Sequence, residues 1–178
     1  MTDPASNSVR DLLALLGNPP RPDHRIDWDA VEATLGLALP EDYKEFIEAI
    51  GPGGIGDEIV LTCPDADNPN LNFLVYNDDM TGAFRTLLAR EPIDLPYPFY
   101  PDKDGLVAWA YTANGHVFYW STAGPASDWA VVVGEARGPD WYQFDGGTAE
   151  FLLGLLGGTI TVPFLDDELP ADHTFTRY

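Results

Sequence analysis

The spacing of apolar residues predicts two short helices near the start of the chain. The first is expected over residues 8–16, where Ser8 can cap the N-terminus and Gly17, with two prolines after it, ends the helix. The second is expected to begin after its cap Asp27 and to end at Gly36. Both segments keep their apolar residues on one side, so both are expected to pack on a core.

A third helix is expected to begin at Pro40 and to end at Gly51, where the pattern G-x-G-x-x-G starts. In dinucleotide-binding loops this pattern leads from a strand into a helix N-terminus, which attracts phosphate. Here Gly51, Gly53 and Gly56 leave a helix and enter the strand-like "EIVLT". The nearest helix end is therefore negative, and we interpret the glycines as a cap and a turn.

After this turn the hydrophobic period becomes that of strands. "EIVLT" and "LNFLVYN" are predicted as strands, and residues 78–90 as a helix capped by Asn77 or Asp78. The expected inner side of this helix consists of Met80, Phe84, Leu87 and Leu88. The proline-rich "EPIDLPYPFYP" then predicts a loop.

The clearest hairpin lies in "GLVAWAYTANGHVFYWS", in which "NG" matches a type I′ turn. A two-residue loop would pair Tyr111 with Phe118 and Trp109 with Trp120. These four aromatic side chains would share one face of the sheet, which is expected to be core, while the opposite face is expected nearer to solvent.

Strands and one more helix are predicted for the last third of the chain. "DWAVVVGE" and "WYQFDG" indicate strands, and Thr148 is the expected cap of a helix over "AEFLLGLLGG". The final segment is partly polar, but Val162, Phe164 and Phe175 suggest that it packs on the body of the domain.

Composition indicates a folded, acidic protein. The chain has 178 residues, 45% of them apolar, with five Trp and a formal net charge of -20. That length can bury a core without disulfides, and Cys63 is the single cysteine. Because the N-terminus lacks a secretory pattern and the apolar runs are short, we expect a cytoplasmic protein without membrane association. Nine unclustered Lys and Arg disfavour direct nucleic-acid binding.

Enzymatic and metal sites find little support in the sequence. Cys63 has no local His partner, and His24, His116 and His173 are far apart. The adjacent carboxylates at 78–79 and 166–167 are expected to diverge, and "DADNPN" lacks the Gly and Glu of a calcium loop. We predict no catalytic residue, no cofactor and no metal; a looser calcium site stays an alternative.

Two parts of the chain resemble one known family. "IDWDAVEATLGLALPEDYKEFIEAIGPGGIGDEI" resembles the N-terminal signature of the SUKH superfamily, and "GHVFYW" with "DWAVVVGEARGPDWYQFDGGTAEFLLGLL" is similar to its C-terminal half. The core resemblance covers residues 26–157, which divides the chain into an N-terminal helix and linker, 1–25, and a SUKH-like domain, 26–178. Pro52 stands where the family turn usually has Asn, so no role is carried over for that side chain.

The resemblance implies a single α+β domain with a mixed or mostly antiparallel sheet flanked by helices. It also implies protein binding, because bacterial members are widely regarded as immunity proteins that neutralise toxins, often nucleases, and fungal relatives are cell-wall regulators. An acidic inhibitor would be steered to a toxin domain with a basic surface. The alternative is a regulatory scaffold or small-ligand-binding protein of the same fold, since acidity also keeps proteins soluble.

Contact residues for such a partner are expected on acidic and aromatic loops. The candidates are Asp57, Glu58, Asp65, Asp67, Asp78, Asp79, Tyr97, Phe99, Tyr100, Asp102 and Asp104.

Overall fold

A seven-stranded antiparallel sheet forms the centre of the computed structural model, which describes residues 4–23, 25–90, 95–165 and 167–178. The strand order is β6-β5-β4-β3-β2-β1-β7. In chain order the elements are α1 (Pro4–Leu15), α2 (Trp28–Leu35), α3 (Glu41–Ile50), β1 (Gly53–Ile55), β2 (Ile59–Leu61), α4 (Phe73–Arg90), β3 (Leu106–Thr112), β4 (Val117–Ser121), the 3-10 turn η1 (Ala126–Asp128), β5 (Ala130–Gly134), β6 (Trp141–Phe144), α5 (Thr148–Leu156) and β7 (Phe175–Arg177). The predicted α+β class with a mostly antiparallel sheet is confirmed.

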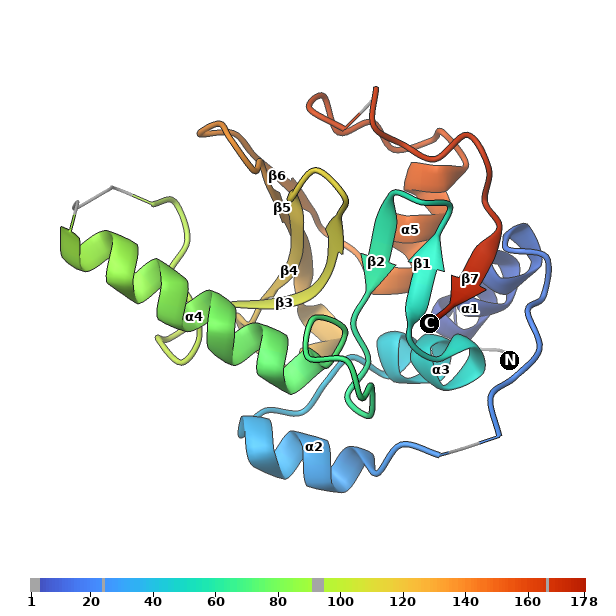
Figure 1. The fold of residues 1–178 in the computed structure, drawn as a ribbon, viewed down its shortest axis with the longest axis horizontal. Coiled ribbons are helices and arrows are strands. Elements are labelled where there is room, and N and C mark those ends of the chain that lie inside the picture. The colour runs from blue at the N-terminus through green and yellow to red at the C-terminus, as the bar shows by residue number, and fades with distance from the viewer. Residues whose placement is uncertain (1–3, 24, 91–94, 166) are drawn as a thin grey trace.

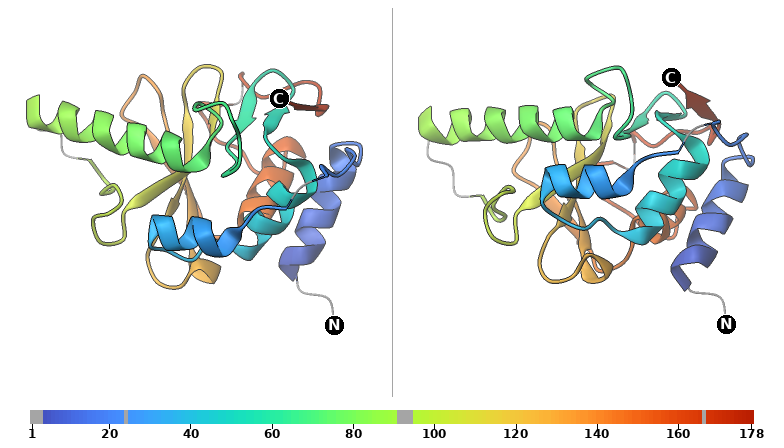
Figure 2. Two further views of the ribbon diagram at one scale, coloured as in Figure 1. Left: turned by 60° about the horizontal axis from the view of Figure 1, so that its bottom comes forward. Right: turned by 90° about the horizontal axis from the view of Figure 1, so that it is seen from below.

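Helices lie on both faces of the sheet. In Figure 1 α4 crosses in front of β3, whereas α5 and α1 lie behind β1, β2 and β7. In the view from below, α4 and the β1–β2 hairpin follow one side of the molecule, and α1 extends towards the other (Figure 2). The described helices include none that is long and apolar enough to cross a membrane.

The main core fills the space between the sheet and α1, α3 and α5. Its largest fully buried side chains include Tyr43, Phe46, Trp109, Trp120 and Phe151. A smaller apolar cluster lies on the opposite face of the sheet, beside α4 and the 97–99 segment. It consists of Leu106, Ala108, Val117, Tyr119 and Val132. The face that the sequence placed nearer to solvent is therefore buried in part, because α4 covers it.

The β3–β4 hairpin exists, but its predicted turn and register are wrong. Asn114 does not have the positive φ that a type I′ turn requires, and Gly115 alone in the turn does, with φ 92°. Pairing shifts at a bulge between Ala108 and Ala110, after which Tyr111 faces Val117 rather than Phe118. Trp109, at the bulge, joins Phe118 and Trp120 in the core as predicted, whereas Tyr111 moves to the opposite face.

Helix α4 begins earlier than predicted, so the expected strand "LNFLVYN" is wrong. Asn72 caps the helix, because its side-chain oxygen accepts the N–H groups of Leu74 and Val75 at 3.1 and 3.2 Å. Asn77 is thus not a cap but lies within α4, where its amide bonds both the N–H and the carbonyl of Ala108 at 2.7 Å. This pair of bonds fastens α4 to β3.

The second half of α4 is less buried than its apolar pattern predicts. Met80, Phe84 and Leu88 are half-buried, and Leu87, predicted to face inwards, is 42% exposed. Phe73 is the one described residue of α4 that is fully buried. The helix continues past the sheet (Figure 1), so its last turns have no sheet surface on which to pack.

Two further predicted caps are wrong, while others are confirmed. Ser8 lies inside α1, which begins at Pro4. Thr148 is the first residue of α5 rather than its cap, and its hydroxyl accepts the indole N–H of Trp120 at 2.9 Å. Asp27 caps α2 through the N–H of Ala30, as predicted. The left-handed Gly36 and the positive-φ Gly51 end α2 and α3, also as predicted.

The glycine-rich segment contains a strand as well as a cap and a turn. Gly51 ends α3 and Gly56, with φ 55°, begins the turn to β2, whereas Gly53 belongs to β1. A Cβ at Gly53 would lie 2.3 Å from the carbonyl oxygen of Thr176 in β7. The absence of a side chain therefore allows β7 to pair with β1, and the C-terminal segment packs on the domain as predicted.

Candidate functional site

Asp42, in the signature segment "LPEDYKEF", connects the N-termini of two helices. Its Oδ1 accepts the N–H of Tyr43 in α3 at 2.8 Å, and its Oδ2 accepts the N–H of Ala149 in α5 at 2.9 Å. Burial raises the pKa of Asp42, and the N–H groups of Ala149, Tyr43 and Thr148 partly offset this. The cap of α5 thus comes from a residue 107 positions away, which local sequence patterns do not reveal.

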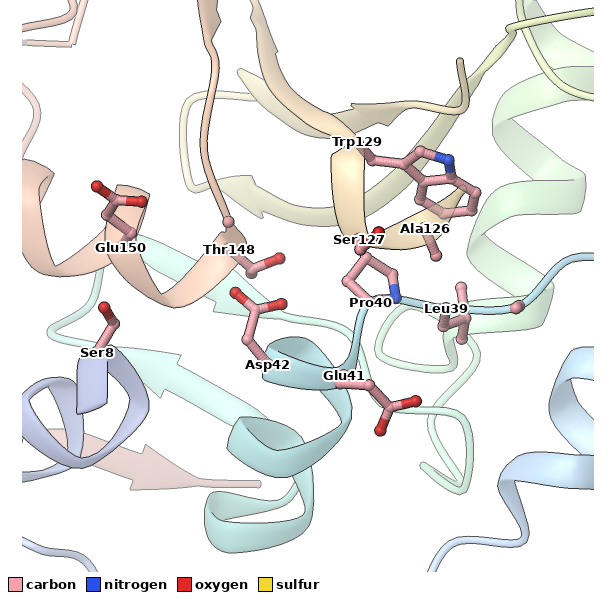
Figure 3. A pocket seen from close by; sticks show the side chains of 12 residues that line it. Ser8, Leu39, Pro40, Glu41, Asp42, Ala126, Ser127, Trp129, Thr148 and Glu150 are labelled. Atoms are coloured by element: carbon pink, nitrogen blue, oxygen red, sulfur yellow. The ribbon is translucent and has the colours of Figure 1, made fainter. Parts of the chain in front are cut away.

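A pocket of about 550 Å³ lies beside Asp42. Figure 3 shows that its wall is built from the start of α3, the start of α5, the η1 turn and Ser8 of α1. Asp42 points towards Thr148, whereas Glu41 and Glu150 point away from each other. The described lining residues include no Cys, His, Lys or Arg. The lining carboxylates are Glu41, Asp42 and Glu150, and the oxygens of Asp42 already accept N–H groups, so the arrangement suits binding better than nucleophilic chemistry.

The other signature residues also hold the fold together. The hydroxyl of the buried Tyr43 donates to the carbonyl of Thr62 at 2.9 Å, and its ring meets Trp120 edge-on at 4.7 Å. Lys44 bonds Glu32 of α2 at 3.0 Å, and Glu32 also accepts the N–H of Leu39 at 2.9 Å. The signature therefore describes the joint between α2, α3, α5 and the sheet, and a contact surface must be sought elsewhere.

Six of the predicted contact residues lie in one stretch of the chain. Asp57 and Glu58 form the β1–β2 turn, Asp65 and Asp67 lie in the 62–72 loop, and Asp78 and Asp79 are on α4. All are exposed except Glu58, which is half-buried. Asp65 also accepts a hydrogen bond from the thiol of Cys63 at 2.8 Å. These six residues are not in contact as one cluster; they lie at the two ends of β2 and along α4.

The remaining five predicted contact residues lie in the 95–105 segment, where the aromatic ones have partners within the chain. The Tyr97 hydroxyl donates to the side-chain oxygen of Gln143 in β6 at 2.9 Å, and the Tyr100 hydroxyl donates to the carbonyl of Leu35. Phe99 stacks on Phe84 of α4 with ring centroids 3.9 Å apart. These contacts hold the loop against three elements. Asp102 and Asp104 are exposed at its tip, and Asp104 has a positive φ of 57°.

The cysteine and the histidines occupy separate places. Cys63 is buried, and burial together with Asp65 raises the pKa of its thiol far above neutral pH. His116 is buried against Phe164; its Nδ1 accepts the N–H of Ala136 at 3.2 Å, and its Nε2 lies 2.8 Å from Glu168. Among the described residues, no group of three His, Cys, Asp or Glu could hold a metal ion. His24 and Asp166 lie outside the described residues.

The fold and this geometry define the class of protein: an α+β domain whose described surface offers pockets and acidic loops. The chain belongs to the SUKH_6 family, described as SMI1-KNR4 cell-wall, whose model matches residues 26–152. The predicted SUKH resemblance is thus confirmed, over residues 26–152 of the expected 26–157. No curated protein and no solved structure matches the chain significantly.

Proposed function

We propose that this chain is a non-enzymatic protein-binding module, and specifically an immunity protein that neutralises a bacterial toxin domain with a basic surface. One observation carries the proposal: between residues 45 and 84 there is no Lys or Arg. The same stretch contains eight acidic residues, Glu45, Glu48, Asp57, Glu58, Asp65, Asp67, Asp78 and Asp79. Family membership supports it, because an immunity role is compatible with a SUKH domain.

The physical basis is electrostatic steering. A continuous negative potential raises the association rate with a basic partner and lowers it for nucleic acids. A toxin that acts on nucleic acid needs a basic groove for phosphate, so an acidic inhibitor could cover that groove. The described lining of the pocket beside Asp42 includes no Cys, His or Lys, which agrees with inhibition by binding rather than by chemistry.

The test is calorimetry with the C-terminal domain of a toxin encoded beside the gene, at low and high salt, with a growth-rescue assay in parallel. We expect tight binding that weakens as salt increases, together with rescue of growth. Binding without rescue would assign the chain to a scaffold role, and no binding at either salt concentration would refute the proposed pairing.

The pocket beside Asp42 supports a second function, binding of a small polar ligand. Its volume of about 550 Å³ lies within the range of small-molecule sites, and Ser127 and Glu150 at its wall offer polar groups. Replacing Ser127, which is exposed, by Trp would fill the pocket. Under this function a metabolite library should raise the melting temperature of the wild type but not of Ser127→Trp, whereas equal shifts would argue against the pocket.

A further inference from the structure

The outer face of β7, β1 and β2 is not covered by a described helix. Figure 1 shows α5 behind these strands and nothing helical in front of them, while α4 crosses β3 beside them. The register places Thr176, Gly54, Val60 and Tyr111 side by side on this face. Their neighbours along the strands, such as Ile55 and Ile59, point into the core on the other side. On this face Thr176 is exposed, Val60 and Tyr111 are half-buried, and Gly54 is buried.

Three tyrosines and one valine form the surface here, which we call the tyrosine face: Val60, Tyr76, Tyr111 and Tyr178. Tyr76 of α4 stacks on Tyr111 with ring centroids 5.0 Å apart and an interplanar angle of 17°. The Tyr178 hydroxyl lies over Gly54, where a Cβ would approach it to 2.7 Å. Tyr178 is 56% exposed, one of the exposed large apolar side chains of the described chain.

Acidic residues surround the tyrosine face. Asp57 and Glu58 lie at one end of β2, and Asp65 and Asp67 lie in the loop after its other end. Asp79 is three positions after Tyr76 on α4, so it lies on the same side of that helix.

The elements at the centre of this face supply almost no positive charge. Residues 45–84 contain neither Lys nor Arg. Arg177 of β7 is directed to the opposite side, where its guanidinium donates to the carbonyls of Ile50 and Pro20.

We propose that the tyrosine face is the docking surface for a protein partner whose contact region has an apolar centre surrounded by Lys and Arg. This inference rests on the proposed function and adds the location and chemistry of the interface. Tyrosine supplies large, amphipathic contact area and is enriched in interface hot spots. The stacking of Tyr76 on Tyr111 orders both rings before binding, which lowers the entropic cost of association.

Charge decides between the possible occupants. A second copy of this chain would bring two acidic rims together, and like charges oppose that contact. Nucleic acid would be repelled in the same way by the acidic rim. A basic protein surface is the remaining class that complements both the apolar centre and the rim.

The grooves beside the second half of α4 are less suitable for a basic partner. They measure about 450 and 380 Å³ and share Phe84 and Leu95. Arg85 lines the smaller groove, and Lys103 follows Asp102 of the same lining. Arg137 lies between Ala136 and Gly138, which line the larger groove. Three of the nine positive residues therefore lie near these grooves, in contrast to the tyrosine face.

The first experiment maps the contact surface without knowledge of the natural partner. Cytochrome c, a small basic protein, is added at low salt to the isotope-labelled chain, and amide chemical shifts are followed. We expect the changes to concentrate on β1, β2, the 62–72 loop and the first turns of α4. Changes centred on another surface, or no interaction at low salt, would overturn the inference.

The second experiment uses matched variants with the toxin domain. The triple variant Asp57→Lys, Asp67→Lys and Asp79→Lys reverses the rim, and Asp23→Lys, Asp128→Lys and Asp140→Lys makes the same change of net charge at exposed positions elsewhere. Tyr178→Ala truncates the centre, and Leu87→Ala truncates another exposed apolar residue outside it. We expect the rim and centre variants to weaken binding on the order of tenfold or more, and the controls to change it by less than about threefold.

The outcomes separate the two proposals. Tight wild-type binding with equal losses in the rim variant and its charge control would overturn the tyrosine face while leaving the immunity proposal intact. No wild-type binding to the toxin domain would refute that pairing, and the cytochrome c map would still decide whether this face recognises a basic protein. Circular dichroism of each variant confirms that the fold is unchanged.

Discussion

At the scale of single residues, carboxylates that look alike in the sequence have different tasks. Asp42 is buried and serves the backbone of two helices, whereas Asp57, Asp67 and Asp79 are exposed and available to a partner. The sequence predicts Asp57, Asp67 and Asp79 as contact residues and assigns no separate role to Asp42. Only the tertiary structure separates a carboxylate that stabilises the fold from one that can bind.

Replacing Asp42 with Ala should lower the free energy of unfolding by about 1 to 3 kcal/mol, because it leaves the N–H groups of Ala149 and Tyr43 buried without an acceptor. Asp42→Asn retains one acceptor oxygen and should lose less. Urea titration measures the free energy of unfolding of both variants. An unchanged midpoint for Asp42→Ala would show that the α5 cap contributes nothing to stability.

The contact between Glu32 and Lys44 predicts a contribution to the free energy of unfolding that depends on pH. Partial burial acts to raise the pKa of Glu32, but the N–H of Leu39 and the Lys44 ammonium favour the carboxylate more and lower it. The contribution is therefore present above the unfolded pKa of about 4.3 and is lost as pH falls through the lower folded value. The stability difference between wild type and Glu32→Gln should be larger at pH 7 than at pH 3. A constant difference would contradict the assignment.

At the scale of elements, local patterns predict helices with caps well and strand registers poorly. The caps of α2 and the end of α3 follow from Asp27, Gly36 and Gly51, because each acts on its own neighbours. The bulge at Trp109 has no marker in the sequence, yet it moves Tyr111 to the outer face. The tyrosine face could not be predicted for this reason.

The start of α4 shows the same limit. The run from Leu71 to Asn77 satisfies a strand pattern, and the cap at Asn72 competes with it. Packing against β3 and the bonds between Asn77 and Ala108 decide in favour of the helix. Asp57, Asp67 and Asp79 could be named from the sequence, but the side chains between them could not.

Gly53→Ala should weaken the pairing of β7 with β1, since a Cβ there would lie 2.3 Å from the Thr176 carbonyl. We expect faster hydrogen exchange at the β1 and β7 amides and earlier proteolysis within the C-terminal segment. Gly82→Ala is the matched control: it lies within α4, nothing approaches its Cβ position within 4 Å, and it should stabilise by up to about 1 kcal/mol. Equal behaviour of the two variants would exclude a role for the close strand approach.

At the scale of the whole molecule, the net charge of -20 lowers the stability of the folded state. Like charges repel one another in the folded state more than in the expanded chain. The protein therefore maintains a surface that its own stability disfavours, which is consistent with a surface kept for a partner of opposite charge.

Added sodium chloride should raise the melting temperature, because salt screens the repulsion among the exposed carboxylates. Differential scanning fluorimetry at several salt concentrations measures the effect. The rim variant, with three aspartates replaced by lysine, should melt higher than wild type at low salt and respond less to added salt. A melting temperature that falls with salt would show that specific ion pairs outweigh the general repulsion.

The buried thiol of Cys63 makes the chain convenient for site-directed labelling. It is the single cysteine of the sequence, is buried, and donates a hydrogen bond to Asp65. A maleimide dye should therefore not react with the folded wild type. It should modify only a cysteine introduced on the surface, for example at Asp67 or Asp79. Such a dye would report the binding of a partner at the tyrosine face through its fluorescence, without any need to remove the native cysteine.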